Sequence, residues 1–307
     1  MHSSRSTIFH LPIGRGCPVQ CTWCSGSSLP QETITGRREV TFRGVEYVLR
    51  SIKEALSYGY QTFHISFDPD PQHPDYYLSL FSRIREERMN LDCIFESFGL
   101  PTVDFISSFK KTFSGPQSRI VLSPDVGSDR LRTIHKGHAY TNLTLVECLG
   151  LMKEHRVYCD LYFTMGLPFE TKEDLCKTIR FQREIRRRFS NVRRISTFPV
   201  YLEPGSPMHL RPEDYGIVTS LREFVDFYQY HSANETPFSS SGYWIPNFFA
   251  GVNGQKDFDE TLQKVKCRYL CSFHPDPGKS SSPSWGRRWC NLYNLFWRAK
   301  DRLSRKL

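Results

Sequence analysis

The stretch GCPVQCTWC, residues 16–24, contains three closely spaced cysteines, Cys17, Cys21 and Cys24. This spacing lets one tight loop direct three thiolates toward a common centre, and no fourth cysteine follows before Cys93. A structural zinc site closes its shell with four protein ligands, whereas a catalytic metal site keeps one position open. Thiolate ligands suit iron–sulfur clusters as well as zinc. The loop therefore predicts a metal centre with one open position.

The cysteine content argues against a disulfide framework. Ten cysteines in 307 residues are far fewer than small secreted domains carry, and residues 1–9 contain no long apolar segment of the signal-peptide kind. No apolar stretch approaches the ~20 residues of a membrane span. We therefore expect reduced cysteines and a cytoplasmic protein without a membrane span. A zinc site, completed by His10 or by a more distant residue, stays open as an alternative.

Hydrophobic periodicity predicts the fold. Short apolar runs alternate with amphipathic helical patterns, which is typical of parallel βα units. The expected strands cover residues 7–13, 62–67, 92–98, 119–123, 157–164 and 195–201, and the expected helices cover residues 41–58, 75–88, 101–113, 142–155 and 171–189, the third starting at Pro101. Six strands joined by five crossovers predict an α/β fold of the partial (β/α)6 TIM-like barrel type. The cysteine loop then follows the first strand, at the C-terminal rim where barrel enzymes place their chemistry.

The barrel pattern ends near residue 210. Residues 211–307 are rich in aromatic residues and less periodic. We therefore expect two domains, with residues 1–210 as the barrel and residues 211–307 as an α-rich or irregular extension that covers the mouth or the side of the barrel. Three cysteines of this extension, with one histidine between them, are candidates for a second metal site, namely Cys267, Cys271, His274 and Cys290. The alternative is that these cysteines pack as small apolar side chains.

Further polar blocks occupy the ends of the predicted strands. They are SFDPD at residues 66–70, IVLSPDVGS at residues 120–128, FTMGLPFET at residues 163–171 and LEPGSP at residues 202–207. In the third block, Gly166 permits a close backbone approach and Pro168 fixes the turn. All of these blocks also make ordinary strand-to-helix turns, in which an aspartate before proline or a capping Thr171 has only a structural role.

With the cysteine loop and these blocks in this order, residues 7–210 resemble the radical S-adenosylmethionine (radical SAM) enzyme superfamily, most closely the barrel and C-terminal region of its cobalamin-dependent members. In that family a CxxxCxxC loop carries a [4Fe–4S] cluster and has an aromatic residue before the last cysteine, here Trp23, which the resemblance places beside the cofactors. The resemblance implies that Cys17, Cys21 and Cys24 hold the cluster and that S-adenosylmethionine is the second cofactor. An electron from the reduced cluster then cleaves S-adenosylmethionine to methionine and a 5′-deoxyadenosyl radical, which acts on a small-molecule or peptide substrate that the sequence does not identify.

The resemblance also implies which residues contact the methionine amino group and the ribose of S-adenosylmethionine. The family's Gly-Gly-Glu-like turn is replaced here by residues 66–70, where Asp68, or else Asp70, would bind the amino group. Ser123 and Asp125 match the fourth-strand positions near the ribose hydroxyls, whose protons a carboxylate accepts.

The resemblance also assigns residues to two other parts of S-adenosylmethionine, the adenine and the methionine carboxylate. The fifth-strand block corresponds to the adenine side of the site, through Phe163, Gly166 and Glu170. Arg132 or Lys136 would pair with the methionine carboxylate, the alternative being that both are merely solvated.

Partner chains follow from the same resemblance. Cobalamin-dependent relatives carry a cobalamin-binding domain before the barrel, whereas 16 residues precede Cys17 here. If cobalamin is used, we expect a separate chain to supply it, and this chain is then the catalytic subunit of a cobalamin-dependent methyltransferase. The expected electron donor is a flavodoxin or a ferredoxin. A non-catalytic zinc or RNA-binding protein is the remaining alternative.

The net charge of +9 is concentrated in arginine-rich residues 180–194 and in residues 287–306. Basic patches of this kind bind RNA or an acidic partner in some proteins. More often they are solvated faces, so we expect no nucleic-acid partner.

Overall fold

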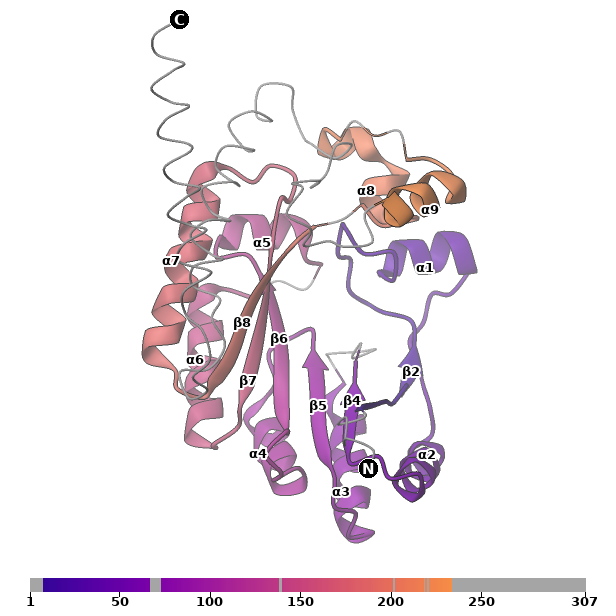
Figure 1. Ribbon diagram of the computed structural model, residues 1–307, viewed down its shortest axis with the longest axis vertical. Helices are drawn as coiled ribbons and strands as arrows, with labels where there is room; N and C mark the ends of the chain where they lie inside the picture. The colour runs from indigo at the N-terminus through magenta and orange to yellow at the C-terminus, as the bar shows by residue number, and fades with distance from the viewer. Residues whose placement is uncertain are drawn as a thin grey trace, which may run out of the picture. The chain divides into compact units, whose positions relative to one another are not determined.

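A six-stranded parallel sheet forms the centre of the computed structural model, which describes residues 8–66, 73–137, 140–200, 202–217, 219 and 221–233. The strands lie in the order of the chain (Figure 1): β1 (Ile8–His10), β4 (Thr62–Ile65), β5 (Asp92–Ser97), β6 (Arg119–Asp125), β7 (Cys159–Met165) and β8 (Val192–Pro199). Every neighbouring pair is parallel. This confirms the predicted α/β class, and an open sheet of six parallel strands is compatible with a partial barrel.

Helices connect successive strands, as the periodicity predicts. They are α2 (Val45–Ser57), α3 (Pro74–Glu86), α4 (Val103–Thr112), α6 (Asn142–Glu154) and α7 (Lys172–Arg188). The prediction that the third of them starts at Pro101 is wrong. Thr102 is the N-cap of α4, because its Oγ1 accepts a hydrogen bond from the N–H of Phe105 at 3.2 Å, and the helix begins at Val103.

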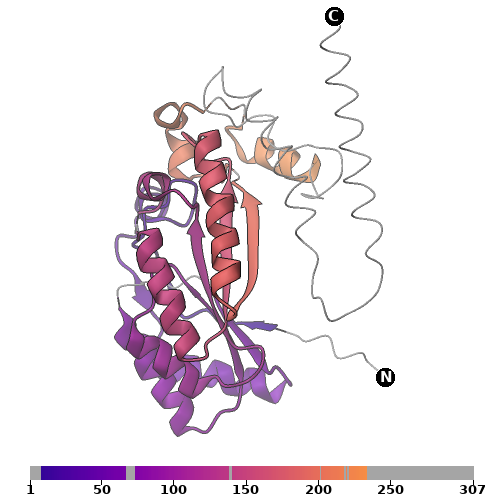
Figure 2. The same ribbon diagram turned by 90° about the vertical axis from the view of Figure 1, so that its left-hand side faces the viewer.

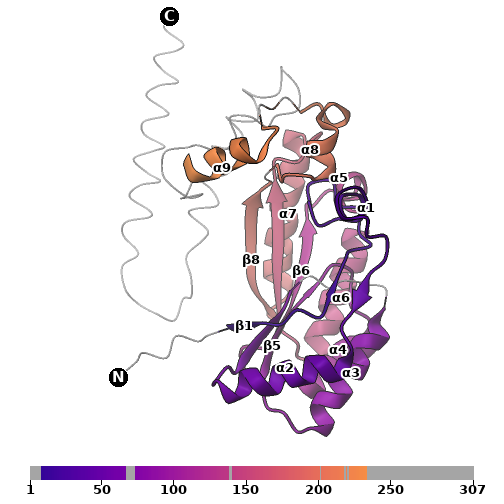
Figure 3. The same cartoon turned by 90° about the vertical axis from the view of Figure 1, so that its right-hand side faces the viewer.

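The two faces of the sheet differ in polarity because side chains alternate along each strand. One face is apolar and packs on the helices through buried residues of neighbouring strands, among them Phe63, Phe95, Leu122, Leu161 and Ile195. Figures 2 and 3 show the connecting helices α2, α3, α4, α6 and α7 on this face. The strand positions that alternate with these belong to the opposite face of the sheet. Several of them carry polar side chains, among them His64, Glu96, Asp160 and Tyr162.

Several short elements gather beyond the carboxyl ends of the strands (Figure 1). They are the helices α1 (Ser28–Thr35), α5 (Asp129–His135), α8 (Pro207–Leu210) and α9 (Phe224–Ala233) and the 3-10 helix η1 (Pro212–Tyr215). A small antiparallel ribbon of β2 (Gly14–Arg15) and β3 (Thr41–Phe42) flanks the cysteine loop in sequence. A second apolar core lies among these elements, around Leu131, Leu167 and Met208.

None of these elements was predicted as separate, since each is too short to show a clear hydrophobic period. Within the described parts of the chain, every helix is too short or too polar to span a lipid bilayer. The predicted domain boundary at residue 210 stays a prediction.

Candidate functional site

The three cysteines of the N-terminal stretch lie between β2 and α1, near the carboxyl edge of the sheet. Successive turns shape the loop, since the N–H of Cys24 donates to the carbonyl of Cys21 and the N–H of Ser27 donates to the carbonyl of Cys24, each at 3.3 Å. The N–H of Gly26 donates to the Sγ of Cys24 at 3.3 Å. All three thiols are partly exposed. The loop therefore presents its sulfur atoms to a ligand while its backbone stays hydrogen-bonded.

The three thiols are close enough to influence one another. Burial raises the pKa of Cys21 to about 12, and the neighbouring sulfurs of Cys24 and Cys17 raise it further while Lys136 opposes the shift. Burial, followed by the carboxylate of Glu203, raises the pKa of Cys24 to about 11. The free thiols of Cys21 and Cys24 are thus protonated at neutral pH. A bound metal centre supplies the positive charge that stabilises the thiolate forms.

The donor set of the loop consists of thiolates, which suit iron–sulfur clusters. In a [4Fe–4S] cluster each cysteine binds a different iron. Three cysteines on one loop satisfy three irons and leave the fourth without a protein ligand from this loop.

Two later segments of the chain support the cysteine loop. The N–H of Thr22 donates to the carbonyl of His135 at 3.0 Å, and the N–H of Met208 donates to the carbonyl of Thr22 at 3.0 Å. The Oε2 of Glu203 accepts hydrogen bonds from the N–H of Ser25 at 2.8 Å and from its hydroxyl at 3.0 Å. The loop is therefore fixed by the connection that follows β6 and by the connection that follows β8.

His135 joins the cysteine loop to the loop that follows β7. Its Nε2 lies 2.7 Å from the carbonyl oxygen of Pro168, and its Nδ1 lies 2.8 Å from the hydroxyl of Thr22. Burial lowers the pKa of His135, so the imidazole is neutral at neutral pH. Because a carbonyl only accepts, Nε2 carries the proton and Nδ1 accepts from Thr22. The ring of Trp23 lies beside this imidazole, with 6.4 Å between ring centroids.

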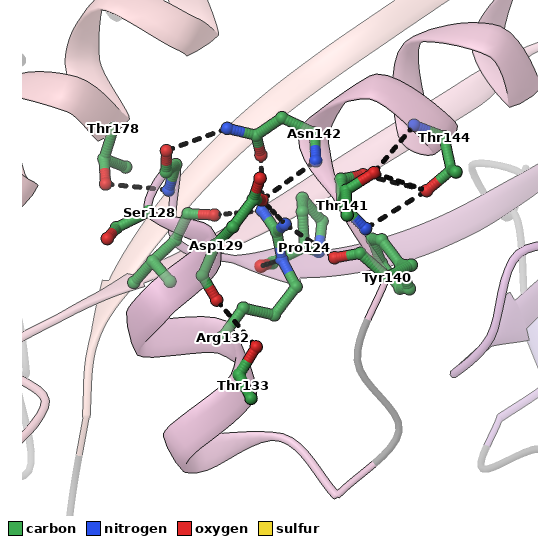
Figure 4. Close-up of polar contacts among 12 residues, drawn as sticks. Pro124, Ser128, Asp129, Arg132, Thr133, Tyr140, Thr141, Asn142, Thr144 and Thr178 are labelled. Atoms are coloured by element: carbon green, nitrogen blue, oxygen red, sulfur yellow. Dashed lines mark hydrogen bonds and ion pairs between the residues drawn. The ribbon is translucent and has the colours of Figure 1, made fainter.

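Arg132 holds together the segment that supports the loop, as Figure 4 shows. Its side chain is 1% exposed. Its donors reach five acceptors: the carbonyls of Pro124 at 3.0 Å, Tyr140 at 2.8 Å and Val126, and the side chains of Asp129 at 2.6 Å and Asn142 at 2.7 Å. Since a guanidinium has five N–H groups, none is left for a methionine carboxylate. This corrects the expectation for Arg132 and gives it a structural role.

The expected ribose-binding positions form a buried ion pair in the structure. The Nζ of Lys136 lies 2.9 Å from the Oδ2 of Asp125 and 2.9 Å from the carbonyl oxygen of Ser123. The strand pairing of β6 with β7 is irregular between Leu122 and Asp125, and Asp125 has a left-handed backbone with φ of 61°. Asp125 is 5% exposed and Lys136 is 4% exposed. The structure thus brings Ser123, Asp125 and Lys136 together beneath the cysteine loop.

Gly166 and Glu170 form a second acceptor site at the end of β7. Gly166 has a φ of 89°, which favours glycine, and its N–H donates to the Oε2 of Glu170 at 2.6 Å. The other oxygen, Oε1, is buried and has no hydrogen-bond partner among the described residues. Burial raises the pKa of Glu170 to about 7, although the backbone N–H groups of Gly166 and Leu167 favour the ionised form. A buried acceptor without a donor fits a ligand that donates a hydrogen bond, as an adenine amino group does.

Replacing Glu170 by glutamine is expected to flatten the dependence of stability on pH. The folded chain holds the carboxyl proton up to about pH 7, whereas the unfolded chain releases it near the ordinary pKa of 4.5. The folded state therefore binds more protons between these values, and its stability falls as the pH rises through them. Between pH 5.5 and pH 8 the loss is about 2 kcal/mol at most. Thermal unfolding of both chains at these pH values measures it, and equal slopes contradict the assignment.

The remaining predicted site residues differ in their exposure, and some of them lie outside the described residues. Phe163 is 0% exposed and packs against Phe181 of α7, which leaves it no free surface for a cofactor. Trp23 is partly exposed and packs against the second apolar core. The candidates Asp68, Asp70, Cys267, Cys271, His274 and Cys290 all lie outside the described residues.

The polar face of the sheet adds residues that the sequence reading missed. The rings of His10 and His64 lie 5.0 Å apart, and the Nε2 of His64 lies 3.4 Å from the Oε1 of Glu96. Toward the opposite edge of the same face, Tyr162 contacts the exposed ring of Phe198, with 5.7 Å between centroids. A polar residue at every second position of an otherwise apolar strand is the signal that could have found them.

The most direct comparison is with protein-family models. The model described as the Radical SAM superfamily matches residues 11–181. No curated protein sequence matches the chain.

Solved structures of similar fold include two of the radical S-adenosylmethionine methyltransferase TsrM from Kitasatospora setae. One, with tryptophan substrate and a SAM analogue bound, is 15% identical with a TM-score of 0.55 and covers 70% of this chain and 40% of that chain. The other, with cobalamin and a [4Fe–4S] cluster bound, is 15% identical with a TM-score of 0.55 and covers 71% of this chain and 39% of that chain. SuiB from Streptococcus suis, bound to S-adenosylmethionine, is 14% identical with a TM-score of 0.49 and covers 75% and 49%. At these identities the likeness concerns the fold alone, and the chain spans about two fifths of the length of TsrM.

Proposed function

The chain belongs to the radical SAM superfamily, whose enzymes use a [4Fe–4S] cluster and S-adenosylmethionine, and on that premise we propose that it binds the cluster through Cys17, Cys21 and Cys24 and cleaves S-adenosylmethionine reductively. The single observation that carries the proposal is that Cys17, Cys21 and Cys24 lie on one short loop whose backbone is tied to His135, Met208 and Glu203. When bound, the cluster supplies the electron that breaks a sulfonium C–S bond, giving methionine and a 5′-deoxyadenosyl radical. The protein's part is to hold the cluster, to align S-adenosylmethionine with it and to exclude water.

The loop contributes a fixed geometry to this chemistry. Because the backbone on both sides of Cys21 and Cys24 is tied to His135, Met208 and Glu203, the thiols need little rearrangement on binding iron. Pre-organised ligands lower the entropic cost of assembling a site. The neutral His135 contacts both Thr22 and Pro168. It therefore fixes the position of the cysteine loop relative to the end of β7.

The end of β7 is the best-supported contact for S-adenosylmethionine. Gly166 lets a planar ring approach the backbone, and the buried Oε1 of Glu170 is an acceptor that lacks a donor. Trp23 lies near the same region, because its ring packs beside the imidazole of His135. Ser123 keeps its side chain for a ligand, since only its carbonyl is used by Lys136. Contacts of Asp68 or Asp70 with the methionine amino group stay predictions from the sequence.

The polar face of the sheet supports a polar substrate. His10, His64 and Glu96 come from three adjacent strands, β1, β4 and β5, and each is the last or the second-last residue of its strand. Helices α2, α3, α4, α6 and α7 cover the other face (Figure 3), so this wall is not part of the main apolar core. A substrate bound against it would lie at the same edge of the sheet as the cysteine loop, within the enclosed region where a radical is used.

Partner proteins follow from the chemistry. A one-electron donor of the flavodoxin or ferredoxin kind would reduce the cluster, and cobalamin carried by a separate chain stays a prediction. Membership in a family of enzymes argues against the alternative of a non-catalytic zinc or RNA-binding protein.

Anaerobic reconstitution of the full chain with iron and sulfide tests the proposed function. We expect about four irons per chain, and 5′-deoxyadenosine detected by mass spectrometry after addition of S-adenosylmethionine and dithionite. Reactions without reductant and without S-adenosylmethionine are the controls. A chain that retains zinc but no iron, or that holds the cluster yet forms no 5′-deoxyadenosine, contradicts the proposal.

A further inference from the structure

The ion pair of Asp125 and Lys136 is expensive for the fold. Both side chains are buried, and the Nζ of Lys136 lies 2.9 Å from the Oδ2 of Asp125. Removing two charges from water costs several kcal/mol per ion, and their attraction does not reliably recover it. Asp125 also has a left-handed backbone, which most residues avoid. Two costs that meet at one buried residue point to a role beyond folding.

The pair lies directly beside the cysteine loop. Residues 135–137 run alongside residues 20–22, because the N–H of Thr22 donates to the carbonyl of His135 at 3.0 Å. A Cβ on Gly137 would clash with the backbone nitrogen of Gln20, so this backbone contact requires glycine. Lys136 lies between these two contacts on one segment, as Cys21 does on the other. The charged pair is therefore placed at the ligand Cys21.

Charges in this position act on whatever Cys21 binds. The backbone contacts of Thr22 with His135 and of Gly137 with Gln20 hold Lys136 opposite Cys21. In the low-dielectric interior, Coulomb energies are several times larger than in water. A cluster gains one negative charge when it accepts an electron from its donor, and no proton is involved. A nearby cation stabilises the reduced form and a nearby anion destabilises it.

We propose that the two buried charges beside Cys21 shift the reduction potential of the cluster held by Cys17, Cys21 and Cys24 in opposite directions, with Lys136 raising the potential and Asp125 lowering it. This inference rests on the proposed function, because it needs the cluster. The pair acts through charge and position. Lys136 is thus a tuning residue, and its bonds to Asp125 and to the carbonyl of Ser123 hold it in place.

Three variants separate charge from structure: Lys136→Met, Asp125→Asn and the double variant. Lys177→Met is the matched control, because Lys177 forms an exposed ion pair with Glu173 on α7. The midpoint potential of each reconstituted chain is measured by redox titration followed by electron paramagnetic resonance. The titration contains no S-adenosylmethionine, so a contact between Lys136 and a methionine carboxylate cannot contribute.

We expect Lys136→Met to lower the ratio of reduced to oxidised cluster about ten-fold at a fixed potential, which is about 59 mV for one electron. Asp125→Asn is expected to shift the ratio in the opposite direction. The double variant should return close to the wild-type value, and Lys177→Met should not move it. Opposite shifts with partial cancellation are not produced by a purely structural role.

Shifts of the same sign, or unchanged potentials in chains that hold an intact cluster, overturn the inference and leave the proposed function standing. If Lys136→Met loses the cluster, the Asp125→Asn chain decides, because it keeps Lys136 and must show a higher potential. A wild-type chain that assembles no cluster overturns the proposed function itself, and the inference with it.

Discussion

The Cys21→Ala variant is expected to bind no stable cluster and to form no 5′-deoxyadenosine above the level of a reaction without reductant. Cys21 is the central ligand of the loop, and its thiol interacts with those of both Cys17 and Cys24. Removing it leaves two ligands for a cluster that needs three from this loop. Iron content after anaerobic reconstitution and mass-spectrometric detection of 5′-deoxyadenosine are the two measurements.

Cys176→Ala is the matched control for this loss. Cys176 is a partly exposed cysteine on α7, and no role in the candidate site is assigned to it. This variant should bind iron and form 5′-deoxyadenosine as the wild type does. Wild-type amounts of both in the Cys21→Ala chain would show that the cysteine loop is not the cluster site.

Replacing Arg132 by methionine is expected to lower the free energy of unfolding by about 3–5 kcal/mol. The substitution removes a fully buried guanidinium and leaves the carbonyls of Pro124, Val126 and Tyr140 without their donor. Buried acceptors that lose a partner carry the full cost of their desolvation. Urea unfolding followed by circular dichroism measures the change.

Two further variants sharpen the Arg132 prediction. Arg132→Lys should recover little of the loss, because a lysine has three donors and no planar fork. Arg188→Met breaks a pair with Glu184 in which both side chains are 52% exposed, and we expect it to cost about 1 kcal/mol or less. If Arg132→Met proves no more costly than Arg188→Met, the five hydrogen bonds do not stabilise the folded chain as argued.

The regular part of the fold could be predicted because its signal is local. In α2, buried residues recur at helical spacing, with Val48, Leu49, Ile52 and Ala55 on one stripe, and the sequence alone displays that period. The six strands were found in the same way, with ends that differ by a few residues from the observed ones. The cysteine loop could be predicted because the spacing of its ligands lies within nine residues of sequence.

The supports of the site could not be predicted because they depend on distant contacts. Arg132 resembles an ordinary solvated helix residue in the sequence, and only the arrival of Tyr140 and Asn142 beside it makes it a buried centre of hydrogen bonds. Asp125 and Lys136 were assigned to separate parts of a ligand, whereas the irregular end of β6 joins them to each other. His64 and Glu96 escaped notice because neighbouring strands bring them together.

The long sequence separation between the cysteine loop and its supports constrains how the enzyme matures. The hydroxyl of Thr22 binds a residue 113 positions later, and the N–H of Ser25 binds one 178 positions later. During synthesis, the thiols leave the ribosome long before the segments that hold their loop exist. The loop therefore gains these supports only after the chain has been made to about residue 208.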